Sequence, residues 1–297
     1  MSAACSLGKL FLKGGTVALT KVTRFIRPRT LAEAFSALTE NQARIIAGGI
    51  DVILFPNEAT ALIDITSLPL SGIEQGSDGI TIGATTTLTE VLESSIVKDY
   101  LGGVVADALH TVASPLQRNL GTIGGSLVIA HPWSDVITLF LALGARVRYF
   151  DGEEHEVPLS DFYARNVHRQ KMILTQVELP AFPGESAAAF WKFSRTAFDI
   201  AILNCAAFVR IEEGVCAEAR IAVGGTPARA AIATAAGEAL VGNPLSPATI
   251  DAAVAAAQGK VEVRDDMRAS ADYRRELVAT GIRRLFSQVK ERLEGSG

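Results

Sequence analysis

The sequence predicts an α+β protein built in two parts. At 297 residues the chain is long for one hydrophobic core and long enough for two domains. Runs of predicted strands and runs of predicted helices follow one another instead of alternating strictly, which is typical of the α+β class. The segment "PAFPGES", residues 180–186, gathers two prolines and a glycine and is the best candidate boundary between the parts.

The first part opens with a predicted helix, "TLAEAFSALTEN" (residues 30–41), whose apolar residues recur on one face. Thr30 and Glu33 have the spacing of a capping box, and Thr87 and Glu90 repeat it. Apolar and β-branched runs bounded by glycine or polar residues indicate strands. We expect strands at 43–49, 61–66, 79–87, 145–150 and 172–179, and helices from 87, from about 104 and over 135–143.

The second part begins with the strand-like run "AAFWKFSR" and continues with two long strand runs between 201 and 225. These two runs are joined near Glu213 and Gly214, which predicts a hairpin, although not one of the tightest turn types. Three helical segments finish the chain, at 228–242, 246–260 and 270–293. Ser246 has the position of an N-cap and Pro247 that of the first helical residue.

The composition excludes several classes of protein. The formal net charge is −4 with no basic stripe, so we expect no nucleic-acid partner. Three cysteines (Cys5, Cys205 and Cys216) without C-x-x-C spacing supply neither an iron–sulfur cluster nor a disulfide framework, which favours a reducing cytoplasm. The longest apolar run, residues 136–145, is too short to span a membrane. Residues 1–24 contain lysines and no acid, and we predict an N-terminal extension there instead of a targeting segment.

Two diglycines are the strongest local signals in the chain. Gly48 and Gly49 stand in "IIAGGID", and Gly124 and Gly125 stand in "TIGGS". Backbone N–H groups that converge in a concave loop can hold a dinucleotide's diphosphate, and glycine lets the phosphate approach. The usual G-x-G-x-x-G and G-x-x-x-x-G-K-[ST] patterns are absent. Spacing alone leaves two readings open, a pair of phosphate-binding nests that each follow an extended run or a pair of ordinary turns.

Polar residues near the second diglycine add to this hypothesis. Thr122 and Ser126 flank the glycines and could donate hydrogen bonds to phosphate oxygens. Asp135 follows nine residues later and could accept from a ribose hydroxyl or cap the helix that begins there.

These residues resemble a known family, the FAD-binding medium subunit of the molybdenum hydroxylases, which includes xanthine dehydrogenase and carbon monoxide dehydrogenase. The resemblance runs from about Phe25 to the last helix. Its motifs, in the family's order, are "RFIRPRTLAEAFSALTE", "IIAGGIDVI", "LIDITSLPLSGI", "ITIGATTTLTEV", "VASPLQRNLGTIGGSLVIAHPWSD", "VPLSDFY", "VELP", "FWKFSRTAFDIAILNCAAFV" and "IAVGGTPARA".

The resemblance implies a fold and a set of partners. We expect a two-lobed FAD-binding domain of the vanillyl-alcohol-oxidase (PCMH) type over 25–182, split near residue 78. A C-terminal domain over 187–293 is expected to have a three-stranded antiparallel sheet and a helical bundle. The implied partners are a molybdopterin-containing large subunit and a small subunit with two [2Fe–2S] clusters, in a heterotrimer or a dimer of heterotrimers.

The resemblance also implies which residues bind FAD. The first loop is Ala47, Gly48, Gly49, Ile50 and Asp51, and the second is Thr122, Ile123, Gly124, Gly125 and Ser126. Asp135 matches an acid associated with the adenosine half. Lys192 and Asp199 match positions on the isoalloxazine side, where Ile200 would lie against the ring. Ile50 departs from the Thr or His that is usual in the family. His131 lies within the second motif with no other histidine near it in sequence, so we predict no metal site and no covalent flavin link.

The function implied is electron transfer. Hydroxylation would occur on the large subunit, and FAD on this chain would pass electrons from the clusters to an external acceptor. We therefore predict no acid, base or nucleophile. Two alternatives stay open at this point. One is a self-contained flavin oxidase of the same fold, and the other is a non-catalytic assembly subunit whose FAD site has decayed.

Overall fold

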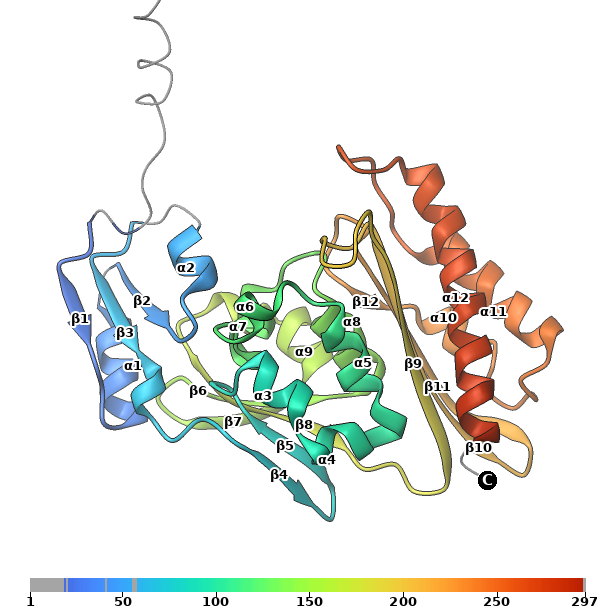
Figure 1. Ribbon diagram of the computed structural model, residues 1–297, viewed down its shortest axis with the longest axis horizontal. Coiled ribbons are helices and arrows are strands. Elements are labelled where there is room, and N and C mark those ends of the chain that lie inside the picture. The colour runs from blue at the N-terminus through green and yellow to red at the C-terminus, as the bar shows by residue number, and fades with distance from the viewer. Residues whose placement is uncertain (1–18, 20, 41, 55–57, 296–297) are drawn as a thin grey trace, which may run out of the picture.

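Three β-sheets lie side by side in the computed structural model, with helices between and outside them (Figure 1). The structure describes residues 19, 21–40, 42–54 and 58–295. Most of the predicted extension, residues 1–24, lies outside these ranges, and its last residue, Arg24, already belongs to the first strand. Within the described residues, no helix is both long and apolar enough to cross a membrane.

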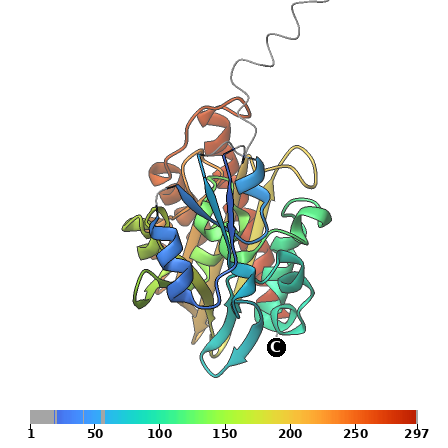
Figure 2. The ribbon, with the colours of Figure 1, turned by 90° about the vertical axis from the view of Figure 1, so that its left-hand side faces the viewer.

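The first lobe contains a three-stranded parallel sheet, which lies in front of the rest of the molecule in Figure 2. Thr30 caps its main helix by accepting from the Glu33 amide, but the Glu33 carboxylate accepts from Arg29 and not from Thr30, so only half of the predicted capping box forms. The elements are β1 (Arg24–Ile26), α1 (Leu31–Thr39), β2 (Ala43–Ile46), α2 (Ile50–Leu54), β3 (Ala61–Asp64) and the 3₁₀ turn η1 (Ile65–Ser67), with strand order β1-β3-β2.

The second lobe is a five-stranded antiparallel sheet in the order β4-β5-β8-β6-β7. Its strands are β4 (Ile73–Gly76), β5 (Gly79–Gly83), β6 (Arg146–Phe150), β7 (Glu154–Pro158) and β8 (Ile173–Pro180). The predicted division near residue 78 falls inside the β4–β5 hairpin. That division is wrong, because two strands that pair in one sheet belong to one lobe, so the change of lobe comes before Ile73.

Helices cover one side of this second sheet (Figure 1). They are α3 (Leu88–Glu93), α4 (Ser95–Asp99), η2 (Tyr100–Gly103), α5 (Val104–His110), α6 (Pro115–Arg118), α7 (Ile123–Ile129), α8 (Asp135–Ala142), α9 (Leu159–Ala164) and η3 (Val167–Arg169). The second diglycine lies in the first turn of α7, a helix that we did not predict, and it follows α6 instead of an extended run. Ser134 caps α8, so the alternative that Asp135 caps this helix is also wrong.

The C-terminal part is an antiparallel sheet covered by helices. It comprises β9 (Glu185–Phe193), β10 (Leu203–Glu212), β11 (Val215–Gly224), β12 (Ala231–Ile232), α10 (Thr234–Glu238), α11 (Pro247–Lys260) and α12 (Ala271–Glu294). The short β12 adds a fourth strand at the edge of the predicted three and replaces the start of the predicted helix 228–242. Glu213 and Gly214 both have positive φ and form a two-residue hairpin loop, so the turn is tighter than we predicted.

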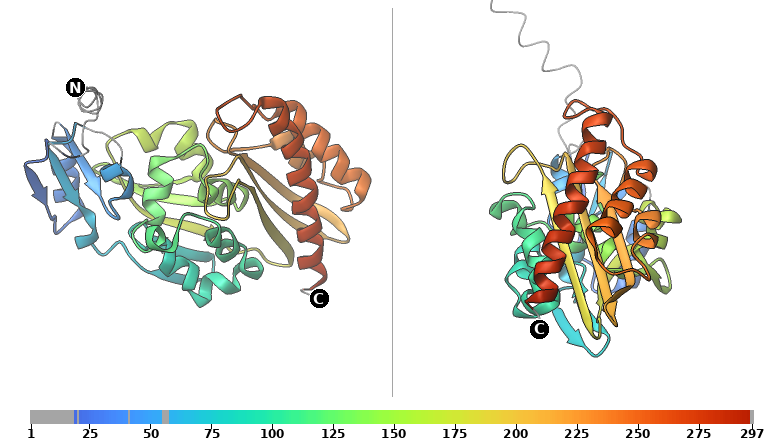
Figure 3. Two further views of the ribbon diagram at one scale, coloured as in Figure 1. Left: turned by 45° about the horizontal axis from the view of Figure 1, so that its top comes forward. Right: turned by 90° about the vertical axis from the view of Figure 1, so that its right-hand side faces the viewer.

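Each face of the C-terminal sheet packs into a different core. Ala188, Phe190 and Phe208 belong to the cluster that includes α5 and α8 of the FAD-binding part. Ala189 and Trp191, their neighbours along β9, belong to the cluster under α11 and α12. This alternation follows from the period of two in a strand. Figure 3 shows α12 lying across the outer face of the sheet.

His168 is buried where the two parts meet. Its Nε2 lies 3.2 Å from Nη1 of Arg229, which comes from the segment between β11 and β12. Burial, Arg229 and Arg169 lower the pKa of the His168 imidazole below its ordinary value, because a second positive charge here would be poorly solvated and repelled.

The free energy of unfolding should therefore fall as the pH is lowered. A group with a depressed pKa that is neutral when folded loses stability once the pH drops below its unfolded pKa, about 6.5 for histidine. Urea unfolding of the wild type and of His168→Gln should diverge in their pH dependence between pH 7 and 5. Replacement of the exposed His110 by Gln is the control. Parallel pH profiles for wild type and His168→Gln would contradict this account.

Candidate FAD site

One cavity of about 430 Å³ lies where the first lobe, the second lobe and the C-terminal sheet meet. Apart from Ile123, which is fully buried in the core, every residue predicted for the site lines it. The predicted residues are separated by up to about 150 positions in sequence, as from Ala47 to Ile200, and the fold brings them to one place. Much of the remaining wall is apolar, which is usual for sites that enclose a ring system.

The glycines of both loops pack closely against neighbouring backbone, and the first loop lies against the segment that leads into the second. A Cβ on Gly48 would overlap the carbonyl group of Leu120, with 2.6 Å to its carbon. A Cβ on Gly124 would lie 2.7 Å from the Ala84 carbonyl oxygen. Gly49 has φ of +77°, which other residues adopt at a cost. The glycines therefore bring segments together in addition to leaving space for a ligand.

The amide groups of the two loops differ in their availability. In the first loop, the N–H groups of residues 48–51 have no hydrogen-bond acceptor among the described residues. In the second loop, Ile123 N donates to Thr86 O, Gly124 N to Ala84 O, and Gly125 N to the Thr122 hydroxyl. Ser126 donates its hydroxyl proton to the Thr122 carbonyl. The amides of residues 123–125 and the Ser126 hydroxyl are thus used within the protein, whereas the Thr122 hydroxyl accepts a hydrogen bond and its predicted donation to phosphate stays a prediction.

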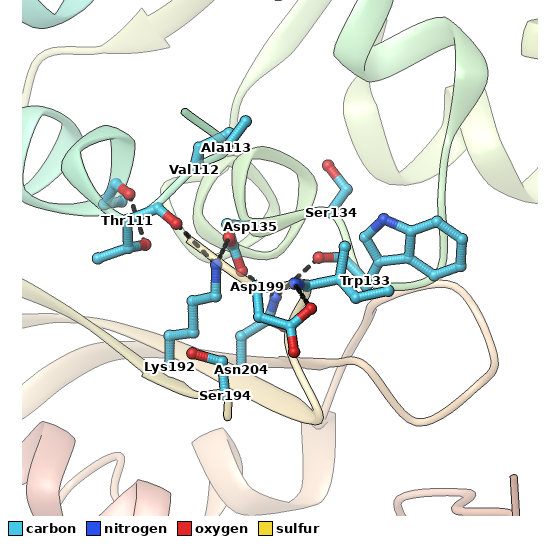
Figure 4. A network of polar contacts seen from close by, with 12 residues as sticks. Thr111, Val112, Ala113, Trp133, Ser134, Asp135, Lys192, Ser194, Asp199 and Asn204 are labelled. Atoms are coloured by element: carbon cyan, nitrogen blue, oxygen red, sulfur yellow. Dashed lines mark hydrogen bonds and ion pairs between the residues drawn. The ribbon is translucent and has the colours of Figure 1, made fainter. Parts of the chain in front are cut away.

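A buried polar network forms another part of the wall (Figure 4). Lys192 Nζ lies 2.8 Å from Asp135 Oδ2 and donates to the Thr111 carbonyl at 2.7 Å. Asn204 donates to Asp135 Oδ1 at 2.6 Å and accepts from Thr138 at 2.8 Å. Burial raises the pKa of the Asp135 carboxyl, while Lys192 and Asn204 favour its charged form.

This network bears on two assignments made from the resemblance. The resemblance assigned Asp135 to the adenosine half and Lys192 to the isoalloxazine side. Because the two side chains form an ion pair that is only 5% exposed at each partner, they face the same part of the cavity. Both assignments stay predictions, and any cofactor atoms that the two side chains contact must lie close together.

The loop between β9 and β10 closes the cavity on the C-terminal side. Asp199 accepts from Arg195 at 2.8 Å, and this hydrogen bond lowers the pKa of the Asp199 carboxyl. Its other oxygen accepts from the Ile200 amide at 2.9 Å. Ile200 and the exposed Phe198 line the same cavity. The Asp199 carboxylate therefore holds the loop between β9 and β10 in the conformation that places these apolar side chains in the cavity wall.

Comparisons with known proteins agree with this geometry. Residues 20–182 match the family described as the FAD binding domain in molybdopterin dehydrogenase, and residues 188–289 match the CO dehydrogenase flavoprotein C-terminal domain. The chain belongs to this family. Its FAD-binding domain thus covers both lobes, and the C-terminal match covers the sheet with its outer helices.

Relatives of this FAD-binding family cover nearly the whole chain. The 6-hydroxypseudooxynicotine dehydrogenase complex subunit alpha of Paenarthrobacter nicotinovorans is 31% identical over 85% of this chain and 88% of its own length. The xanthine dehydrogenase FAD-binding subunit of Escherichia coli O157:H7 is 30% identical, over 88% and 94%. The solved carbon monoxide dehydrogenase from Hydrogenophaga pseudoflava superposes with a TM-score of 0.83 at 27% identity, covering 91% of this chain and 98% of that one.

The residues present fit the cofactor of this family. The first loop offers amide groups that have no acceptor within the part of the chain that the structure describes, and its Gly48 admits no side chain. Sequence reasoning missed two features of the FAD site. Asn204 is a fully buried polar residue in the middle of the apolar run "AILNCAAFV", which is a signal that could have been used. His131 contacts Asp51 of the first loop, and no local pattern could reveal that contact across 80 positions.

Proposed function

We propose that the chain is the FAD-binding electron-transfer subunit of a molybdenum-containing hydroxylase or dehydrogenase. It would pass electrons from [2Fe–2S] clusters on a partner to an external acceptor, in the cytoplasm. The observation that carries the proposal is the meeting of the two predicted loops at one cavity in a chain of an FAD-binding family. FAD, when bound, supplies a centre that accepts and releases electrons one or two at a time.

The protein's own residues would bind and orient this group. The amide groups of residues 48–51 are available as hydrogen-bond donors to the diphosphate. They would replace the water that the diphosphate loses on binding, and no side chain has to move for this. Lys192 is fixed by Asp135 and Thr111 and presents a positive charge at the cavity wall. Ile50, Phe198 and Ile200 supply apolar surface that excludes water from a ring system.

Exposed apolar side chains near the cavity support assembly with a partner. Leu116 and Leu120, on and after α6, are 78% and 57% exposed, and Phe198 is 53% exposed. Arg118 of α6 lies 6.0 Å from the Phe198 ring, so α6 and the β9–β10 loop are neighbours. Exposed large apolar side chains that gather at one place are typical of protein interfaces. We infer that a molybdopterin-containing large subunit and a small subunit with two [2Fe–2S] clusters assemble with this chain as a heterotrimer.

The test is to purify the chain under native conditions together with any partner subunits that bind it. We expect a yellow complex that absorbs at about 450 nm, releases FAD on denaturation, and contains molybdenum and iron. Iron and molybdenum should remain with the other subunits when they are separated. Substrate turnover by the isolated chain would instead support a self-contained flavin oxidase. A colourless chain that cannot be reconstituted with FAD would support a decayed site.

A further inference from the structure

Carboxylates outnumber fixed positive charges at the wall of the cavity. Its charged lining residues, among those described, are Asp51, Asp135 and Asp199 against the single lysine Lys192. Asp135 and Asp199 are held by Lys192 and Arg195 respectively. An anionic diphosphate therefore meets a local electrostatic problem at Asp51, which belongs to the loop with the available amide groups.

His131 supplies a partner for this carboxylate. Its Nε2 lies 2.6 Å from Asp51 Oδ1, and both side chains are 29% exposed. A carboxylate only accepts hydrogen bonds, so Nε2 must carry the proton. The imidazole is stacked on the Trp133 indole, with ring centroids 4.6 Å apart and planes 11° apart. Arg268 lies 5.4 Å from the Trp133 ring. The ring of His131 is thus fixed from one side while its nitrogen holds Asp51.

We propose that His131 is a positioning residue of the cofactor site, which holds the Asp51 carboxylate away from the amide groups of residues 48–51. Those amides then stay available to the cofactor's diphosphate, and the Asp51 carboxylate has the imidazole as its own hydrogen-bond partner. The inference rests on the proposed FAD function. It assigns a role to a residue that belongs to neither glycine loop and lies 80 positions from its partner.

The decisive test is a rescue experiment on FAD affinity. His131→Phe keeps an aromatic ring for the Trp133 stack but releases Asp51, so the FAD dissociation constant should rise roughly 10- to 100-fold. The double variant His131→Phe with Asp51→Asn should recover to within about threefold of wild type, because a neutral amide does not repel the diphosphate. Both constants are measured by quenching of flavin fluorescence, with no turnover required.

The chain contains a matched control. His155 Nε2 lies 2.9 Å from Asp151 Oδ1, and its ring stacks on Tyr149 with centroids 5.0 Å apart. This pair does not line the cavity, so His155→Phe should leave FAD affinity unchanged. If His131→Phe does not fold, His131→Gln serves instead. Its amide can still donate to Asp51, so affinity should fall by less than about threefold, whereas a tenfold loss would contradict the proposal.

The outcomes separate the two levels of inference. Wild-type protein that binds no FAD would overturn the proposed function and this role with it. Wild-type protein that binds FAD while His131→Phe binds equally well would overturn the role of His131 alone. A double variant as weak as His131→Phe would also overturn it, since His131 would then act only as a structural link between the lobes.

Discussion

Replacing Gly48 by valine is expected to reduce FAD affinity by about 100-fold or more, which corresponds to about 3 kcal/mol. A Cβ at this position overlaps the Leu120 carbonyl group, which is main chain and cannot rotate away. The first loop must then move away from the segment that precedes the second loop, and the amide groups of residues 48–51 leave their places in the cavity wall. Equilibrium binding followed by flavin fluorescence measures the effect.

Gly259→Ala is the matched control for Gly48→Val. Gly259 lies on α11, and a Cβ there meets nothing within 4 Å. Alanine should leave FAD binding unchanged and stabilise the helix by up to about 1 kcal/mol. Circular dichroism should show that Gly48→Val retains its secondary structure, since the cores of the lobes are not altered. Normal FAD affinity in folded Gly48→Val would contradict the account of the loops.

Replacing Lys192 by methionine is expected to lower the free energy of unfolding by about 3–5 kcal/mol. The change leaves the Asp135 carboxylate buried with only Asn204 as a hydrogen-bond partner from the C-terminal sheet. Burial already raises the pKa of the Asp135 carboxyl, and loss of the ammonium removes the main opposing influence. A carboxyl with a raised pKa contributes more stability at low pH and loses it as the pH rises, so Lys192→Met should be less impaired at pH 5 than at pH 8.

Urea unfolding at the two pH values measures this effect. Addition of Asp135→Asn to Lys192→Met should restore part of the lost stability and remove its pH dependence, because the buried group is then neutral. Exposed Lys98 on α4 provides the control, and Lys98→Met should change stability by less than about 0.5 kcal/mol. A loss in Lys192→Met that is equal at pH 5 and pH 8 would show that Asp135 stays ionised in the folded variant, as it is in the unfolded chain, and would contradict this account.

The sequence allowed prediction of the α+β class, the FAD family and the residues that line the cavity. These follow from signals that lie close together in the chain, such as a diglycine after a strand or a serine before a helix. The domain boundaries of residues 25–182 and 187–293 stay a prediction, although the segment between them does fall between β8 and β9.

The parts that escaped prediction depend on distant contacts. Helix α7 contains two glycines within its first three residues, which local propensity disfavours. It forms because Thr122 caps it and because Ala84 and Thr86 accept from its first amides. The same applies to the polar pairs. Asn204 reaches Asp135 across 69 positions and His131 reaches Asp51 across 80, and no spacing rule covers such separations.

The C-terminal sheet has a consequence for how the molecule can be divided. Neighbouring residues of β9, such as Phe190 and Trp191, serve two different hydrophobic clusters. A shift of this strand by one position would exchange the residues that face the two clusters. Cutting the chain at residue 186 would expose the apolar residues of α5 and α8 that pack against the C-terminal sheet. The fragment should therefore be insoluble. The flavin-binding half and its C-terminal companion, although matched by separate sequence families, should therefore unfold as a single cooperative unit.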